Sequence, residues 1–180
     1  MAFNKEIEMK FMVDKDKLPP LNNYNSYKFK TFYLGLVDPE IRVRVKNGIE
    51  SSITIKIDNP SVYSRDEFSY PIPLLDIQVL ELHRKSNVIE KIRYYVPVQA
   101  TECSDLVGSF WEVDVYEGKL LGLVTAELEI PENLDRRELK INNPDWIGVD
   151  VTHINLFRNS HLSLLDSVSK ELADYKLWKI

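Results

Sequence analysis

Two pairs of glutamates, each spaced two residues apart, could hold a metal ion in this 180-residue chain. Glu6 and Glu8 form the first pair, Glu127 and Glu129 form the second, and Asp114 is a further candidate. Residues i and i+2 of a β-strand point to the same face, so each pair presents both carboxylates together. Mg²⁺ and Mn²⁺ prefer hard oxygen ligands of this kind. The spacing therefore predicts a site for Mg or Mn.

Basic residues recur with the same spacing and could hold phosphate. One strand with a charged face is ordinary for a half-solvated sheet. Here, however, the charges are sorted: polar positions are basic in 41–46 and acidic in 123–130. A triphosphate carries about four negative charges near neutral pH and needs several Arg or Lys donors. Because the chain has no Gly-rich phosphate loop, side chains must bind the phosphates.

Period-two alternation predicts the strands that position these residues. Helices are predicted from apolar spacing and a proline start, and a turn is predicted at Asn47-Gly48. We expect one α+β domain over 1–180, dominated by antiparallel sheet, because no repeat or linker interrupts it. Charged alternate positions suit a barrel with a charged lumen and helices covering its outer wall. The predicted strands are 5–13, 41–46, 52–57, 64–70, 89–96, 110–117 and 123–130, and the predicted helices are 74–85, 131–141 and 160–175.

Composition narrows the class of protein. The net charge of −5 argues against a nucleic-acid partner, because such proteins usually carry a basic surface. No apolar run approaches the roughly 20 residues of a membrane helix, and the N-terminus has no secretory apolar region. We therefore expect no membrane partner and a cytoplasmic location. Cys103 is the only cysteine, which excludes an internal disulfide and a thiolate zinc cluster.

Taken in order, the motifs resemble those of the CYTH family, the triphosphate tunnel metalloenzymes, over nearly the whole chain. The N-terminal E-x-E-x-K motif stands here as Glu6-Ile7-Glu8-Met9-Lys10. The other motifs are Arg42 and Arg44 in IRVRVKNG, Lys56 in ITIKI, Arg65 and Glu67 in SRDEFSYPIP, Lys91 and Arg93 in IEKIRYYV, Glu112 and Asp114 in WEVDVYEG, Glu127 and Glu129 in GLVTAELEIP, and the segment WIGVDVT.

The resemblance implies a closed eight-stranded antiparallel β-barrel, with helices packed outside and a C-terminal helix. It implies that Mg or Mn is bound by Glu6, Glu8, Asp114, Glu127 and Glu129. Phosphate is expected to be held by Lys10, Arg42, Arg44, Lys56, Arg65, Lys91 and Arg93. The expected catalytic residues are Lys56, which stabilises or protonates the leaving phosphate, Glu67, which orients neighbouring bases, and Lys10.

The chain departs from the family pattern at two places. Ser69 stands where family members commonly carry Glu. In the segment HINLFRNS, Ile154 and Leu156 stand at the usual Asp and Arg positions, and Arg158 replaces an aromatic residue. Arg158 either restores a positive charge at the phosphate site or is a surface arginine.

The leading functional hypothesis is a metal-dependent triphosphatase acting on inorganic tripolyphosphate, with nucleoside triphosphates as further substrates. The enzyme alternatives are a class IV adenylate cyclase, whose His-Phe pair ahead of E-x-E-x-K is missing here, and a thiamine triphosphatase. From a different class, the chain could be a non-catalytic polyphosphate- or nucleotide-binding module. The sequence leaves open the preferred metal and the choice between monomer and homodimer.

Overall fold

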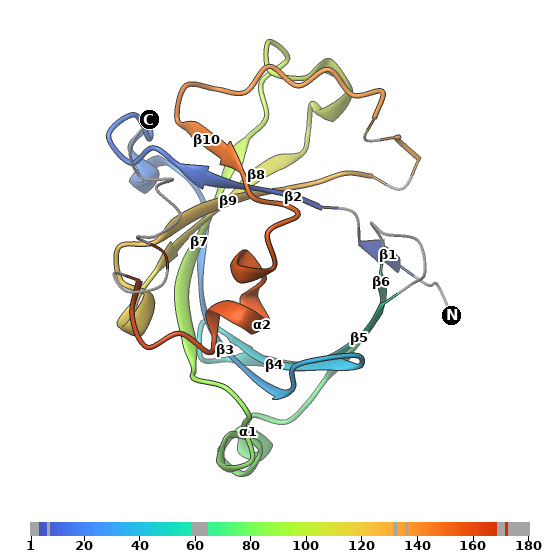
Figure 1. Ribbon diagram of the computed structural model, residues 1–180, viewed down its shortest axis with the longest axis vertical. Helices are drawn as coiled ribbons and strands as arrows, with labels where there is room; N and C mark the ends of the chain where they lie inside the picture. The colour runs from blue at the N-terminus through green and yellow to red at the C-terminus, as the bar shows by residue number, and fades with distance from the viewer. Residues whose placement is uncertain are drawn as a thin grey trace.

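The computed structural model describes residues 4–6, 8–58, 65–131, 133–135, 137–168 and 172. They form one antiparallel sheet, in the order β1-β6-β5-β4-β3-β7-β8-β9-β2-β10, with two α-helices (Figure 1). The strands are β1 Asn4–Glu6, β2 Glu8–Val13, β3 Ser26–Gly35, β4 Glu40–Lys46, β5 Glu50–Asp58, β6 Arg65–Pro71, β7 Ile89–Pro97, β8 Phe110–Tyr116, β9 Val124–Glu129 and β10 Ile147–Asp150. The α-helices are α1 Leu74–Leu82 and α2 Asn159–Leu162, and one 3₁₀ turn, Asn155–Phe157, directly precedes α2.

The prediction of a closed eight-stranded barrel is wrong for the described residues. The sheet has ten strands, and its end strands β1 and β10 do not pair with each other. It still curves strongly, so that β1 and β2, adjacent in the chain, lie near opposite ends of the strand order (Figure 1). The reason is that β2 uses one edge for β9 and the other for β10, which leaves no edge to pair with β6.

The central strand β3 was not predicted from the sequence. It lies between β4 and β7 and therefore joins the two halves of the sheet. Its apolar residues fall on both faces: Phe29 and Tyr33 share one face, Phe32 takes the other, and all three are buried. A strand covered on both sides loses the alternation that reveals a half-solvated strand. The short strand β10 was missed as well.

The β4–β5 hairpin confirms the predicted turn at Asn47-Gly48. Asn47 and Gly48 have φ values of 51° and 71°. Two consecutive left-handed residues make the tight turn that matches the twist of the flanking strands. This turn fixes the register in which Arg42 lies opposite Thr54 and Arg44 opposite Ser52.

The two faces of the sheet differ in character. We call the face that carries Lys10, Arg44, Arg93, Asp114 and Glu127 the inner face. The opposite, outer face is apolar. One of its clusters is built around Trp111, which packs edge-to-face on Phe11 and Trp146. A second groups Phe32, Val43 and Val45 with Ile77 of α1, so that α1 covers part of the outer face.

The helix predictions are confirmed only in part. Helix α1 begins within the predicted range 74–85 and ends at Leu82. The prediction over 131–141 is wrong: the described residues there form turns, from which Leu134 and Leu139 pack on the outer face. No helix in the described ranges has the length and apolar character needed to span a membrane.

The predicted C-terminal helix over 160–175 is wrong over 163–167. Helix α2 ends at Leu162, and Ser163 Oγ donates a hydrogen bond to the Ser160 carbonyl at 2.5 Å, which competes with helical bonding. Except for Leu172, the residues after 168 lie outside the described part.

The expectation that helices pack outside holds for α1 but not for α2. Phe157 and Leu162 pack with Tyr33 and Tyr116, whose side chains belong to the inner face. Helix α2 thus lies inside the curve of the sheet, as Figure 1 shows.

Candidate anion and metal site on the inner face

Strand register brings acidic and basic residues from four neighbouring strands together. In the ladder, Lys10 of β2 lies opposite Glu127 of β9, and Glu127 lies opposite Glu112 of β8. On the next pair, Asp114 of β8 lies opposite Arg93 of β7. Neighbouring side chains on one face of a sheet interact directly. The local alternation of each strand therefore becomes one continuous charged surface.

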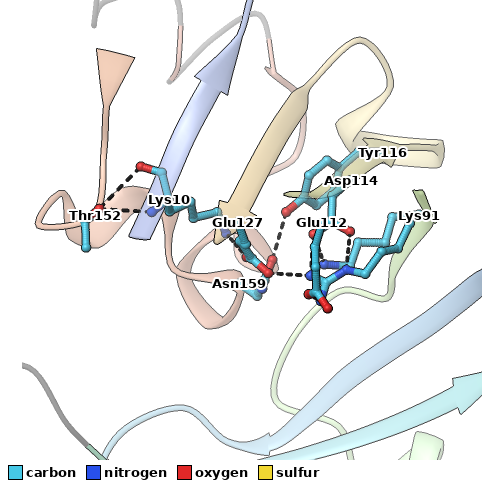
Figure 2. A network of polar contacts seen from close by, with 9 residues as sticks. Lys10, Lys91, Glu112, Asp114, Tyr116, Glu127, Thr152 and Asn159 are labelled. Atoms are coloured by element: carbon cyan, nitrogen blue, oxygen red, sulfur yellow. Dashed lines mark hydrogen bonds and ion pairs between the residues drawn. The ribbon is translucent and has the colours of Figure 1, made fainter. Parts of the chain in front are cut away.

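Arg93 is the centre of this surface, because it contacts Glu112, Asp114 and Glu127, whose carboxylates Figure 2 shows. Its guanidinium donates to both carboxylate oxygens of Asp114, with Nε and Nη2 each at 2.7 Å. It also forms ion pairs with Glu112 and Glu127. Lys91 donates a further hydrogen bond to Asp114, and Lys10 Nζ lies 2.9 Å from Glu127 Oε1. The carboxylates are thus neutralised by the chain's own bases.

Strand β10 holds the backbone of Lys10 in place. Thr152, which follows β10, accepts a hydrogen bond from the Lys10 amide at 2.9 Å, and the Val151 amide donates to the Lys10 carbonyl at 2.8 Å. Gly148 allows the close approach, because a Cβ there would lie 3.0 Å from the Met12 carbonyl oxygen. The WIGVDVT segment therefore positions the backbone of Lys10, which is distant in sequence.

A second cluster lies on β4, β5 and β6. Glu67 accepts from two cations: Lys56 Nζ lies 3.0 Å from one carboxylate oxygen and Arg42 Nη2 lies 3.4 Å from the other. Beside them, Ser69 shares a 3.1 Å hydrogen bond with Thr54. At Ser69, where the family resemblance implied a further carboxylate, this chain thus has a neutral hydroxyl pair with Thr54.

Arg44 is the least compensated cation of the inner face. It lies on β4 and stacks on Phe29, with Cζ 4.8 Å from the ring centroid. Its buried Nε has no hydrogen-bond acceptor, and it pairs with no carboxylate among the described side chains. Burial and the neighbouring charge of Arg42 lower the pKa of Arg44 to about 10. The buried Nε of Arg42 likewise lacks an acceptor.

Burial and mutual repulsion shift other groups of the inner face. Burial, reinforced by Arg93, lowers the pKa of Lys91 to about 8. Burial raises the pKa of Glu112 to about 7, although Arg93 acts in the opposite direction. For Glu127, burial opposes ionisation, but the charges of Lys10 and Arg93 outweigh it and hold its pKa well below the usual value. One site thus contains carboxylates of unequal basicity.

The donor chemistry of the acidic side fits Mg²⁺ or Mn²⁺. Glu112, Asp114 and Glu127 gather hard oxygen atoms around Arg93. The buried Oε1 of Glu127 lies 2.9 Å from Lys10 Nζ and can accept a further ligand, because a carboxylate oxygen has two lone pairs. As they stand, no three acidic, histidine or cysteine residues of the described ranges are spaced to hold an ion. Arg93 and Lys10 lie between the carboxylates instead.

The remaining predicted site residues are placed as follows. Glu8 and Glu129 lie opposite each other where β2 pairs with β9, Glu8 half-buried and Glu129 exposed. The side chains of Glu6 and Arg65 lie outside the described part. Arg158 is exposed at the start of α2.

Glu112 was not among the predicted site residues. Its spacing of two from Asp114 on the same strand was the available signal.

The chain is similar to known proteins in both sequence and fold. No family model matches the chain. An inorganic triphosphatase of Acetivibrio thermocellus is 35% identical over 159 residues, which is 88% of this chain and 92% of that protein. Two crystal structures of one protein, NE1496, match in fold. The structure described as inorganic triphosphatase NE1496 has a TM-score of 0.63 at 23% identity, covering 93% of this chain and 99% of that one. The structure described as a hypothetical protein has a TM-score of 0.61 at 24% identity, covering 88% and 97%.

Proposed function

Because the chain belongs to the CYTH family of triphosphate tunnel metalloenzymes, we propose that it hydrolyses inorganic tripolyphosphate at the inner face of its sheet. The triphosphatase class is supported by the 35% identical relative, which is an inorganic triphosphatase. The observation that carries the proposal is the guanidinium of Arg44, whose buried Nε has no hydrogen-bond acceptor. The buried Nε of the neighbouring Arg42 also has no acceptor. Unpaired buried donors are costly, and a polyanion supplies their acceptors.

Hydrolysis adds water across one P–O–P bond. The oxygen of water bonds to a terminal phosphorus, the bridging bond breaks, and pyrophosphate leaves. Arg42, Arg44, Lys91 and Arg93 bind the negatively charged oxygens, and Lys10 extends the basic surface from β2. Such preorganised cations stabilise the charge that develops in phosphoryl transfer. Lys56, held by Glu67 at 3.0 Å, stabilises or protonates the leaving phosphate.

We propose Mg²⁺ or Mn²⁺ as the cofactor. Glu112, Asp114 and Glu127 would hold it, with Glu6, Glu8 and Glu129 as further candidate ligands. When bound, a divalent ion neutralises phosphate charge and lowers the pKa of a bound water. Arg93 and Lys10, which now pair with these carboxylates, are then available for phosphate oxygens.

The test is release of phosphate from tripolyphosphate with Mg²⁺ or Mn²⁺. We expect metal-dependent release that falls by at least about 100-fold in Glu127→Gln, because a buried acceptor oxygen is lost. Glu138→Gln, at an exposed position outside the sheet, is the matched control and should keep full activity. If neither ion supports release, the triphosphatase proposal fails. Tight binding of tripolyphosphate by calorimetry without turnover would identify a binding module instead.

A specific observation favours a second candidate, hydrolysis of triphosphates that carry a ring. Tyr27 and Tyr95 lie on the inner face next to Arg93 and Glu112 and stack edge-to-face, with centroids 5.7 Å apart. Phe110 stacks on Tyr95 at 6.0 Å. Aromatic side chains of this kind bind bases by stacking. Comparing kcat/KM for ATP and tripolyphosphate in Tyr95→Leu tests it: only the ATP value should fall.

A further inference from the structure

Helix α1 presents a second apolar side that nothing covers in the described structure. Leu75, Val79 and Leu82 are 83%, 59% and 81% exposed, and their spacing places them on one side of the helix. The opposite side carries Ile77, which is buried against the outer face of the sheet. A helix that packs only on its own sheet needs one apolar side, so the second requires another explanation.

The exposed apolar surface extends beyond the helix. Leu74 at the start of α1 is 41% exposed, and Tyr70, near the end of β6 just before it, is 52% exposed. We call Tyr70, Leu74, Leu75, Val79 and Leu82 the α1 patch. Single exposed apolar residues are normal on protein surfaces, but a continuous group marks an interaction site. A standard interface buries about 800 Å² of surface on each partner. A single short helix does not provide that area, so the interface must also include the neighbouring strand β6.

The charges around the patch are self-complementary. Asp76 lies in the first turn of α1, and Arg84 and Lys85 follow its last turn, all three exposed. Glu81, in the last turn, is half-buried and is paired with Lys30 and Arg84. The exposed acidic residue therefore lies at one end of the apolar stripe and the exposed basic residues lie at the other. If a second α1 packs antiparallel, its acidic end meets the basic end of the first at both ends of the contact. A parallel arrangement would place like charges together.

We propose that the α1 patch is the interface of a homodimer in which two copies of α1 pack antiparallel about a two-fold axis near Val79. Self-complementary surfaces of this kind form isologous contacts, the commonest in homo-oligomers. The antiparallel arrangement also sets opposite ends of the two helix dipoles side by side. The interface lies on the outer face, so the proposal stands or fails independently of the triphosphatase activity.

The first test measures mass in solution by sedimentation equilibrium, from low to high micromolar protein. We expect a concentration-dependent rise toward twice the 21.0 kDa of one chain. Val79→Glu places two like charges at the two-fold axis and should leave only monomer. Val107→Glu is the matched control: Val107 is 61% exposed outside α1, and the variant should still dimerise. A wild-type chain that is monomeric at every concentration overturns the proposal.

The second test addresses the antiparallel register with changes at exposed positions. Asp76→Lys alone and the double variant Arg84→Glu/Lys85→Glu alone should each dimerise at least about tenfold more weakly, because like charges then meet. Mixed in equal amounts, these two variants should form a heterodimer with wild-type affinity, since acid again faces base at both ends. If the mixture associates no better than either variant, the antiparallel interface is wrong.

Discussion

Arg44 and Glu112 show how the same sheet surface holds charge in two ways. Glu112 has Arg93 as its counter-ion, whereas Arg44 has an aromatic ring and no carboxylate among the described side chains. In the first arrangement the charge is balanced within the protein. The second leaves a cation that a bound anion stabilises, which is typical of a binding residue.

We expect Arg44→Met to raise KM for tripolyphosphate by about 10- to 100-fold, the equivalent of one hydrogen-bonded charge. The same change should not lower the melting temperature of the ligand-free protein, because a poorly compensated buried donor is removed. Steady-state kinetics and thermal unfolding measure the two effects. Lys28→Met, an exposed change on the other side of β3, is the control; a large loss of stability in Arg44→Met would mean that Arg44 is structural.

Glu112 should make stability depend on pH in the metal-free protein. Folding raises its pKa from 4.5 to about 7, so the folded protein holds this proton more tightly than the unfolded chain. The contribution of Glu112 to the free energy of unfolding is therefore complete below about pH 4.5, and it is lost as the pH rises through about 7. As the pH rises from about 5 to about 8, the free energy of unfolding of Glu112→Gln should increase by on the order of 2 kcal/mol relative to that of the wild type.

Denaturant unfolding in the presence of EDTA measures this difference. Glu50→Gln, at the exposed start of β5, is the control and should follow wild type at both pH values. A Glu112→Gln variant with the pH profile of wild type would contradict the prediction.

At the scale of elements, α2 and the turn before it decide what the inner face can hold. They fill part of the space inside the curve of the sheet through Phe157 and Leu162, and Leu165 after α2 joins the same cluster. The charged clusters therefore lie on the inner-face surface beyond this apolar contact. The segment also brings Asn159 to Tyr116, whose hydroxyl donates a 2.8 Å hydrogen bond to the Asn159 side chain.

We expect Leu162→Ala to lower the free energy of unfolding by about 2 to 4 kcal/mol, because it leaves a cavity in a fully buried contact. Leu164→Ala, two residues further along, changes a side chain that is 52% exposed and should cost less than about 0.5 kcal/mol. Denaturant melts compare the two. Equal losses would mean that α2 does not pack on the inner face in solution.

At the scale of the whole molecule, a chain with a net charge of −5 keeps a basic surface inside its sheet. Arg93, Lys91 and Lys10 neutralise the acidic residues of that surface. These carboxylates therefore have counter-ions within the chain itself.

We expect EDTA to abolish tripolyphosphate hydrolysis while changing the melting temperature by no more than about 2 °C, because buried ion pairs already compensate the carboxylates. Activity and thermal unfolding, measured with and without EDTA on the same sample, test both parts. Restoring Mg²⁺ is the control and should return activity. Unfolding caused by EDTA would show that the ion is structural.

By itself, the sequence determined which residues share a strand face. Alternation over two residues is a local property, so the motifs from Glu8-x-Lys10 to Glu127-x-Glu129 could be found without neighbours. Eight of the ten strands fall within or overlap predicted ranges, and the Asn47-Gly48 turn was identified by its residue types. The charged face and the basic and acidic strands were therefore predictable.

Only the tertiary structure decided which of these faces meet and how. Pairing Lys10 with Glu127, or Arg93 with three carboxylates, depends on strand order, which is a contact between distant segments. The sequence missed β3 because its apolar residues are buried on both faces, and it missed the open ends of the sheet because β10 takes an edge of β2. It also left open which side of the sheet the C-terminal segment covers, since an apolar stripe does not specify which side of a curved sheet will bury it.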